Sequence, residues 1–198
     1  MSTQIERSNT TRTNIVAAAR LAFVTNGYYK SSLETIAADA GCTKGALYHH
    51  YDGKVAVLAA VFQSVCGEIL QTAGREAVRT GDPRKRLKSA AQSWLKAVER
   101  SDARAILLDV APRALGFARA RALEDAIALE ALVGLVRAVV DAEGLGDCID
   151  DLLTARLVNA ALTEIALLRY ASEGQAPSLR QAENAISGII DGVLKRAG

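Results

Sequence analysis

Residues 33–51 constrain the fold of this chain more than any other stretch. Two short segments with helical spacing, 33–40 and 44–51, are separated by the tight turn Gly41-Cys42-Thr43. Glycine suits a turn that needs unusual backbone angles. The apolar residues that would share one inward face are Leu33, Ile36, Ala37, Ala40, Leu47 and Tyr51. This spacing predicts a helix-turn-helix whose second helix reads DNA.

The outward face of the second segment carries groups suited to a DNA groove and its phosphates. At 100° per residue, Lys44, Gly45, Tyr48 and His49 lie opposite Leu47. They provide a cation, a bare backbone position, a hydroxyl and an imidazole. We therefore expect this face to contact DNA.

Residues that begin helices offer further phosphate contacts. Thr43 should cap the second helix, and its hydroxyl and the exposed N–H groups suit an anion. Ser32 offers the same arrangement at the first helix, where Ser31 and Glu34 have capping-box spacing. Lys54, at the start of a long helix, is a further predicted phosphate contact.

Other roles are open to some of these side chains. Tyr48 could be a core tyrosine and Lys44 a solvated lysine, whereas His50 lies toward the buried side and is interpreted as a packing residue. His49 could bind a metal, but no Cys/His/Asp cluster supports one. The sequence therefore predicts no metal site and no cofactor.

The stretch from Ser31 to Lys54 resembles the DNA-binding domain of the TetR family, whose pattern is I-A-x-x-A-G-V-S-x-G-x-L-Y-x-H-F-x-x-K. Departures from it are Cys42 for valine, Thr43 for serine and Tyr51 for phenylalanine. The matching residues are Ile36, Ala37, Ala40, Gly41, Gly45, Leu47, Tyr48, His50 and Lys54.

The resemblance implies roles for individual residues. Phosphate contacts would fall to Thr43, Tyr48 and Lys54. The residues facing the bases would be Lys44, Gly45, Ala46 and His49. Arg7 and Arg12, before the motif in a flexible start, are further candidates for the backbone or the minor groove.

Composition predicts an all-α protein. The chain is rich in alanine and leucine, has 5% aromatic residues and contains three prolines. We expect about nine helices, with a three-helix DNA-binding domain at 1–55 and a bundle for ligand binding and dimerisation at 56–198. The helices outside the motif are expected at 9–26, 54–78, 83–99, 101–109, 118–142, 150–172 and 178–196. Residues 109–116 should break the helical pattern, and the basic run 84–88 should be a solvated face.

Charge, cysteine content and hydropathy argue against several other classes of protein. The net charge of +2 makes any nucleic-acid site a local patch. Three widely spaced cysteines predict neither a disulfide framework nor a zinc site and favour a reducing cytoplasm. The start is polar and no charge-free apolar run reaches spanning length, so we expect neither a signal peptide nor a membrane partner.

The last two helices predict a homodimer. Apolar residues of the last helix recur at alternating steps of three and four, and the helix before it is apolar nearly all round, so one side can face a second copy. The alternative is that both helices belong to a purely internal core. Dimeric TetR proteins use an interface of this kind, built from two helices of each copy. The two DNA-binding domains of such a dimer would require a palindromic operator. The predicted interface residues are Leu157, Ile165, Leu168, Leu179, Ile186, Ile189 and Val193.

The middle of the chain predicts a site for a small-molecule effector. Large apolar groups accompany a few polar residues on apolar helices, as small-molecule pockets require. The candidates are Phe62, Trp94, Leu108, Phe117, Asn159 and Thr163. Each could instead be ordinary core.

These features predict a ligand-responsive transcriptional repressor. Alternatives are an activator or global regulator of the same fold, which would use the same DNA contacts, and a helical interaction module without DNA binding. An enzyme is disfavoured because both histidines lie in the reading helix and few nucleophile–base pairs are placed. Operator bases, effector identity and regulated genes cannot be deduced from the sequence.

Overall fold

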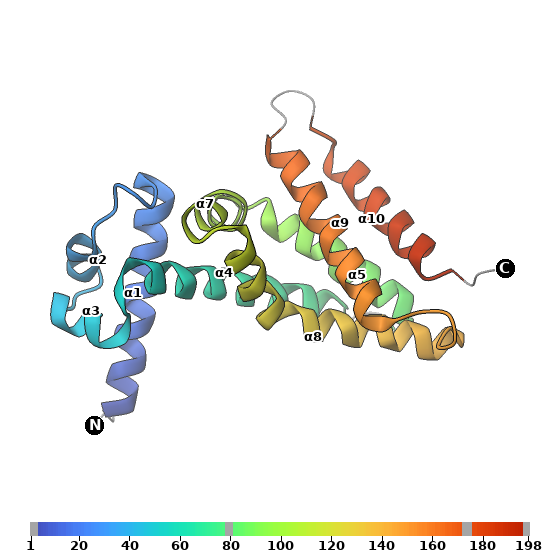
Figure 1. Ribbon diagram of the computed structural model, residues 1–198, viewed down its shortest axis with the longest axis horizontal. Coiled ribbons are helices and arrows are strands. Elements are labelled where there is room, and N and C mark those ends of the chain that lie inside the picture. Colours follow the sequence, from blue (N-terminus) through green and yellow to red (C-terminus); the bar gives the residue numbers. More distant parts are fainter. Residues whose placement is uncertain (1–3, 78–80, 172–175, 196–198) are drawn as a thin grey trace. The chain divides into compact units, whose positions relative to one another are not determined.

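The computed structural model describes residues 4–77, 81–171 and 176–195, and every regular element in these ranges is helical (Figure 1). These ranges contain nine helical segments when the continuous run 101–115 is counted as one, as the sequence predicts. The elements are α1 (Gln4–Asn26), α2 (Leu33–Asp39), α3 (Lys44–His50), α4 (Gly53–Ala77), α5 (Pro83–Val98), α6 (Ser101–Arg104), the π-helical η1 (Ala105–Val110), α7 (Ala111–Leu115), α8 (Phe117–Glu143), α9 (Asp151–Ala171) and α10 (Leu179–Val193).

The chain divides into two compact units. The first contains Met1–Val65 and Asp102–Leu123, and the second contains Cys66–Ser101 and Glu124–Gly198. This division differs from the predicted domain boundary at residue 55. Helix α4 continues without a break from Gly53 to Ala77, and the later segment Asp102–Leu123 belongs to the same unit as the N-terminal helices. That residue 55 separates two functions stays a prediction.

Helix α1 packs against several other helices of the first unit and holds them together. Ile15, Ala19 and Phe23 form a fully buried row on this helix, which packs on both α2 and α3 (Figure 1). A hydrogen-bonded ion pair joins Arg20 Nη2 to Asp102 Oδ2 at 2.6 Å and ties α1 to α6. The helix begins at Gln4, earlier than the predicted residue 9. Arg7 and Arg12 therefore lie on a helix and not in a flexible start.

The core of the second unit lies between α5, α8, α9 and α10. In this unit α10 packs on both α5 and α9 (Figure 1). The core residues, buried from water, are Leu87, Ala91, Leu95, Val136, Val139, Val140, Leu145, Ala155, Val158, Leu162, Ala182, Ile186, Ile190 and Leu194. This continuous apolar cluster is the main source of the unit's stability.

Two residues of the basic run 84–88 do more than face solvent. Arg84 Nη2 lies 2.6 Å from Glu143 Oε2 of α8 and also donates to the Leu194 carbonyl oxygen at 2.8 Å. Lys88 Nζ lies 2.6 Å from Asp191 Oδ2 of α10. The prediction of a merely solvated face is therefore wrong at these positions, because the run lies beside the carboxylates of α8 and α10.

The expected break at 109–116 is confined to the last residue of that range, Gly116. Residues 101–115 are helical throughout, and the chain leaves the helical path only at Gly116, where φ is +82°. The Ala111 N–H donates to the Ile106 carbonyl oxygen, five residues back. Pro112 has no N–H for a four-residue bond, so a π turn before it keeps the helix continuous.

One described helix, α4, is long and apolar enough to cross a membrane by length and composition alone, with a mean hydropathy of 1.5 over its best window. Core helices of other proteins pass the same test, and Val57, Leu58 and Val61 of α4 are fully buried. The absence of a membrane partner stays an expectation.

Candidate nucleic-acid interface

The turn between α2 and α3 satisfies the end of α2 with its own backbone. The Cys42 N–H donates to the Ala37 carbonyl oxygen at 2.9 Å, and the Gly41 N–H donates to that of Ala38 at 3.0 Å. Gly41 adopts φ +66°, which glycine reaches without strain. This hydrogen-bond pair is a Schellman motif, and it fixes where α3 starts.

Side-chain hydroxyls cap both short helices. Thr43 Oγ1 accepts a hydrogen bond from the Ala46 N–H at 3.1 Å, and Ser32 Oγ accepts one from the Thr35 N–H at 3.1 Å. Both caps were predicted. The prediction of a capping box between Ser31 and Glu34 is wrong, because the buried Ser31 hydroxyl instead donates to the Gly27 carbonyl oxygen at 2.8 Å.

The inward face of the motif is as predicted. All its apolar members are buried, and their residues are Leu33, Ile36, Ala37, Ala40, Leu47 and Tyr51. The Tyr51 hydroxyl accepts a hydrogen bond from Arg12 Nε at 3.3 Å, so α1 is tied to the end of α3. Arg12, considered as a DNA contact from sequence, thus has a partner inside the unit.

The outward face of α3 is open to solvent. Tyr48 is 49% exposed, Gly45 and His49 are exposed, and Ala46 is half-buried. A Cβ added to Gly45 would meet only Thr43 Oγ1, at 3.9 Å, so the fold itself leaves room for a side chain there. His50 is half-buried, in keeping with its interpretation as a packing residue.

The two candidate lysines both have partners within the unit. Lys44 Nζ donates to Oε1 of Glu34, an interaction that sequence reasoning missed. Lys54 Nζ donates to the Ser31 carbonyl oxygen at 2.9 Å and lies 4.4 Å from the centre of the Tyr28 ring. Lys54 therefore holds the loop between α1 and α2, and its contact with phosphate stays a prediction.

The predicted dimer residues fall into three groups. Leu157, Leu168 and Ile189 are exposed. Ile165, Leu179 and Val193 are partly buried against their own core. Ile186 is fully buried there, so its assignment to a surface between copies is wrong. The apolar stripe of α10 faces α5 and α9 of the same chain.

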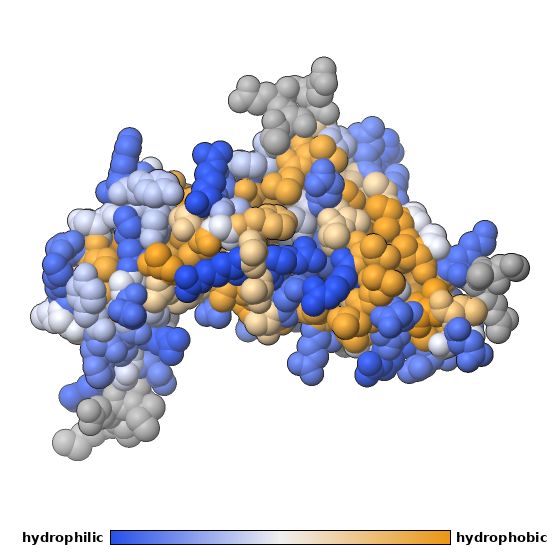
Figure 2. All heavy atoms as spheres, in the orientation of Figure 1, coloured by the Kyte–Doolittle hydropathy of each residue, from blue (hydrophilic) through white to orange (hydrophobic). Residues whose placement is uncertain are grey.

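The exposed apolar side chains of the second unit lie mainly on α9. Figure 2 shows hydrophobic residues gathered over α9 and α10. Leu152 and Leu153 belong to the helix that the sequence shows to be apolar nearly all round, but they are not among the predicted interface residues; the four-residue spacing of Leu153 and Leu157 places Leu153 on the same side as Leu157. Together, the exposed large apolar residues of the two helices are Leu152, Leu153, Leu157, Leu168, Tyr170 and Ile189, which we call the α9–α10 face.

The predicted effector residues are not all in one unit. Phe62, Leu108 and Phe117 belong to the first unit, and Trp94, Asn159 and Thr163 to the second. Phe62 is buried, whereas Phe117 is 67% exposed. Thr163 Oγ1 donates to the Asn159 carbonyl oxygen at 3.0 Å, as helix threonines often do. The effector site stays a proposal.

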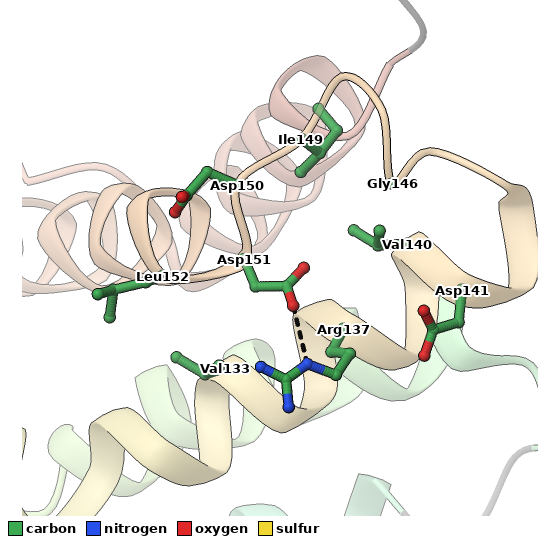
Figure 3. Close-up of a pocket in the computed structure, with 9 residues that line it drawn as sticks. All are labelled: Val133, Arg137, Val140, Asp141, Gly146, Ile149, Asp150, Asp151 and Leu152. Carbon is green, nitrogen blue, oxygen red and sulfur yellow. Dashed lines mark hydrogen bonds and ion pairs between the residues drawn. The ribbon is translucent and has the colours of Figure 1, made fainter.

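A charged cleft of about 420 Å³ lies in the second unit, between the end of α8 and the start of α9 (Figure 3). Arg137 Nε donates to Asp151 Oδ2 across it at 2.8 Å. Its lining residues are Val133, Arg137, Val140, Asp141, Gly146, Ile149, Asp150, Asp151 and Leu152. The predicted effector residues are not among them. In the described ranges, no group of three or more His, Cys, Asp or Glu residues could hold a metal ion.

Known proteins share both the motif and the fold. The HTH-type transcriptional regulator SrpR of Pseudomonas putida is 46% identical over 54 residues, which are 27% of this chain and 25% of SrpR. The crystal structure of a TetR-family transcriptional regulator from Pectobacterium atrosepticum aligns over all of both chains, with a TM-score of 0.74 and 23% identity. That of FadR from Bacillus subtilis, in complex with stearoyl-CoA, covers 90% of this chain and 96% of FadR, with a TM-score of 0.72 and 18% identity.

Family comparison covers most of the chain. Residues 15–61 match the bacterial regulatory proteins of the tetR family, and residues 84–193 match the tetracyclin repressor-like C-terminal domain. The second match alone spans more than half of the 198 residues. The capped α2 and α3, with their buried inner and exposed outer faces, lie within the first match, and the chain belongs to the TetR family of bacterial regulatory proteins.

Proposed function

We propose that this chain binds operator DNA as a homodimer and represses transcription until a small molecule binds to it. The observation that carries the DNA-binding role is the exposed outer face of α3, on a helix anchored by the fully buried Leu47. Lys44, Gly45, Ala46 and His49 would face the bases. Thr43, Tyr48 and Ser32 would contact phosphates, with Lys54 as a further candidate.

The α9–α10 face supports a homodimer. Its exposed leucines lie on one helix, and the neighbouring surface of α10 includes Gly188 and Gly192, where an added Cβ would meet no atom within 4 Å. Large side chains of one copy could pack against this open surface of the other. A two-fold dimer presents its α3 helices in opposite directions, so the operator should be palindromic.

A small molecule would act through linkage between two sites. The effector would bind within the second unit, near Trp94, Asn159 and Thr163, and favour a dimer whose two α3 helices are wrongly spaced for DNA. Operator DNA must then weaken effector binding by the same factor. The stearoyl-CoA complex of FadR supports a ligand-responsive role for this fold, without identifying the ligand here. A regulator of this kind works in the cytoplasm and needs no catalytic residue.

The first test is DNA binding over a range of salt concentrations, with DNA from the chain's own upstream intergenic region. Tight binding should weaken steeply with salt, because binding releases counterions from the phosphates. Tyr48→Ala should abolish specific binding. Tyr48→Phe, which keeps the ring and removes the hydroxyl, should weaken it less. If selection from random DNA also yields no preferred sequence, the proposal is wrong.

The dimer is tested by sedimentation. Leu157→Glu introduces a charge into the α9–α10 face and should yield monomers. Leu21→Glu is the matched control, since Leu21 is an exposed leucine of α1 in the other unit. A Leu157→Glu protein that sediments like wild type would overturn this interface.

A further inference from the structure

The cation at the start of α3 is neutralised by a carboxylate of α2. Lys44 and Glu34 are ten residues apart in sequence, and the turn between the helices brings their side chains into a hydrogen-bonded ion pair. The Lys44 side chain is 56% exposed and that of Glu34 60%, so both can be reached by a ligand. The hydrogen bond between them lowers the pKa of Glu34 and raises that of Lys44, so both remain charged at neutral pH.

The same lysine also lies beside Tyr48. Lys44 Nζ is 6.0 Å from the centre of the Tyr48 ring, one helical turn further along α3. Lys44 thus links the carboxylate of Glu34 to the aromatic ring that we expect at the phosphates. A negative charge is held at the edge of the surface that should meet polyanionic DNA.

We propose that Glu34 is a specificity-determining residue, which keeps non-specific DNA binding weak by competing with phosphates for Lys44. On random DNA, where Lys44 finds no matching base, its charge can only neutralise a nearby phosphate, and that phosphate must displace Glu34 or lie close to its carboxylate. An operator offers base contacts to α3, including Lys44, and these offset the displacement. This inference rests on the proposed role of α3 as the reading helix.

The expected size of the effect follows from counterion release. Each lysine that neutralises a phosphate of duplex DNA adds about 0.9 to the slope of log affinity against log salt. Glu34→Gln keeps the size of the side chain and removes its charge. It should therefore tighten binding to a random-sequence duplex and steepen the slope by about 0.9 for each α3 that contacts DNA. For each such α3, the gain should shrink about threefold between about 50 mM and 200 mM salt. Operator binding should improve less, so specificity should fall.

A double-mutant cycle shows whether the effect passes through Lys44. In a Lys44→Gln background, Glu34→Gln should change neither affinity nor slope. Asp39→Asn is the matched control, because it removes an exposed carboxylate from the same helix. An equal gain from Asp39→Asn, or a gain that persists without Lys44, would show a general charge effect and overturn the proposal. So would weaker binding of random DNA by Glu34→Gln.

Failure of this inference can be told apart from failure of the proposed function. Wild-type protein and Tyr48→Ala are measured first on the upstream DNA. If wild type discriminates operator from random duplex and Glu34→Gln discriminates equally well, the proposed role of Glu34 is wrong, whereas the proposed function is supported. If wild type binds neither duplex and selection from random DNA yields no preferred sequence, the proposed function itself fails.

Discussion

The ammonium group of Lys54, in the first turn of α4, donates a hydrogen bond to the carbonyl oxygen of Ser31 at 2.9 Å. It also lies within 3.4 Å of the Tyr29 carbonyl oxygen and 4.4 Å from the centre of the Tyr28 ring. These contacts connect α4 to the loop that leads into α2. A movement of α4 would therefore reach the DNA-binding helices through Lys54.

Replacement of Lys54 by methionine should destabilise the first unit. The variant keeps an apolar side chain of similar length and loses the charge-assisted hydrogen bond, which should cost about 1–2 kcal/mol. Chemical denaturation at fixed protein concentration measures the loss. If Lys54 instead mainly contacts phosphate, stability will be unchanged and the salt slope of DNA binding will fall by about 0.9.

Gly45→Ala should separate folding from DNA binding. The added Cβ finds open space, and alanine favours a helix by up to about 1 kcal/mol over glycine, so the variant should be at least as stable as wild type. Operator affinity should fall, because the methyl group would stand between the α3 backbone and the DNA. Thermal unfolding and operator titration measure the two effects.

Gly67→Ala provides the control for Gly45→Ala. Gly67 lies inside α4, where an added Cβ also meets no atom within 4 Å. The two variants should gain similar stability, and Gly67→Ala should bind DNA as wild type does. Normal operator binding by Gly45→Ala would mean that DNA does not approach this backbone position closely.

The sequence predicted the features that depend on neighbouring residues. The caps of Ser32 and Thr43, the turn at Gly41 and the buried face with Leu47 all follow from local chemistry. The Glu34–Lys44 pair could not be deduced, because it depends on how α2 and α3 cross. That residues 101–115 stay helical could not be deduced either, because sequence patterns do not show that a π turn can accommodate Pro112.

The two faces of α10 illustrate a further limit of prediction from the sequence. Regular spacing of Ile186 and Ile189 shows that an apolar surface exists, but it does not say which neighbour covers each residue. In the structure Ile186 is fully buried against its own chain, whereas Ile189 is 37% exposed. Which side stays exposed is decided by the packing of α5 and α9.

These two isoleucines should respond differently to truncation. Ile186→Ala leaves a cavity in the core and should destabilise the chain by about 2–5 kcal/mol. Ile189→Ala should change the stability of the monomer by much less and should weaken self-association. Denaturation and sedimentation of both variants test this. Equal destabilisation by both changes in a monomeric background would contradict the assignment of the two faces.

Arg84, Glu143 and Asp191 should make stability depend on pH. Hydrogen bonds from Arg84 and from Lys88 lower the pKa of Glu143 and of Asp191, respectively. A carboxyl group whose pKa is lower in the folded state stabilises the fold above its unfolded pKa. That contribution is lost as the pH falls through the folded value. The loss should therefore begin near the ordinary values of 4.5 and 3.8 and continue below them.

Arg84→Gln should flatten this dependence. Without the guanidinium, the pKa of Glu143 returns toward its ordinary value, and Asp191 keeps only its contact with Lys88. The difference between wild type and variant should be greatest at neutral pH and should shrink in acid. Because both carboxylates are more than one-third exposed, each charge pair should contribute at most about 1 kcal/mol. Arg84 also donates to the Leu194 carbonyl oxygen, and loss of that bond should lower stability equally at every pH. Urea denaturation over a pH series separates the two contributions, and parallel curves for the two proteins would rule out the electrostatic one.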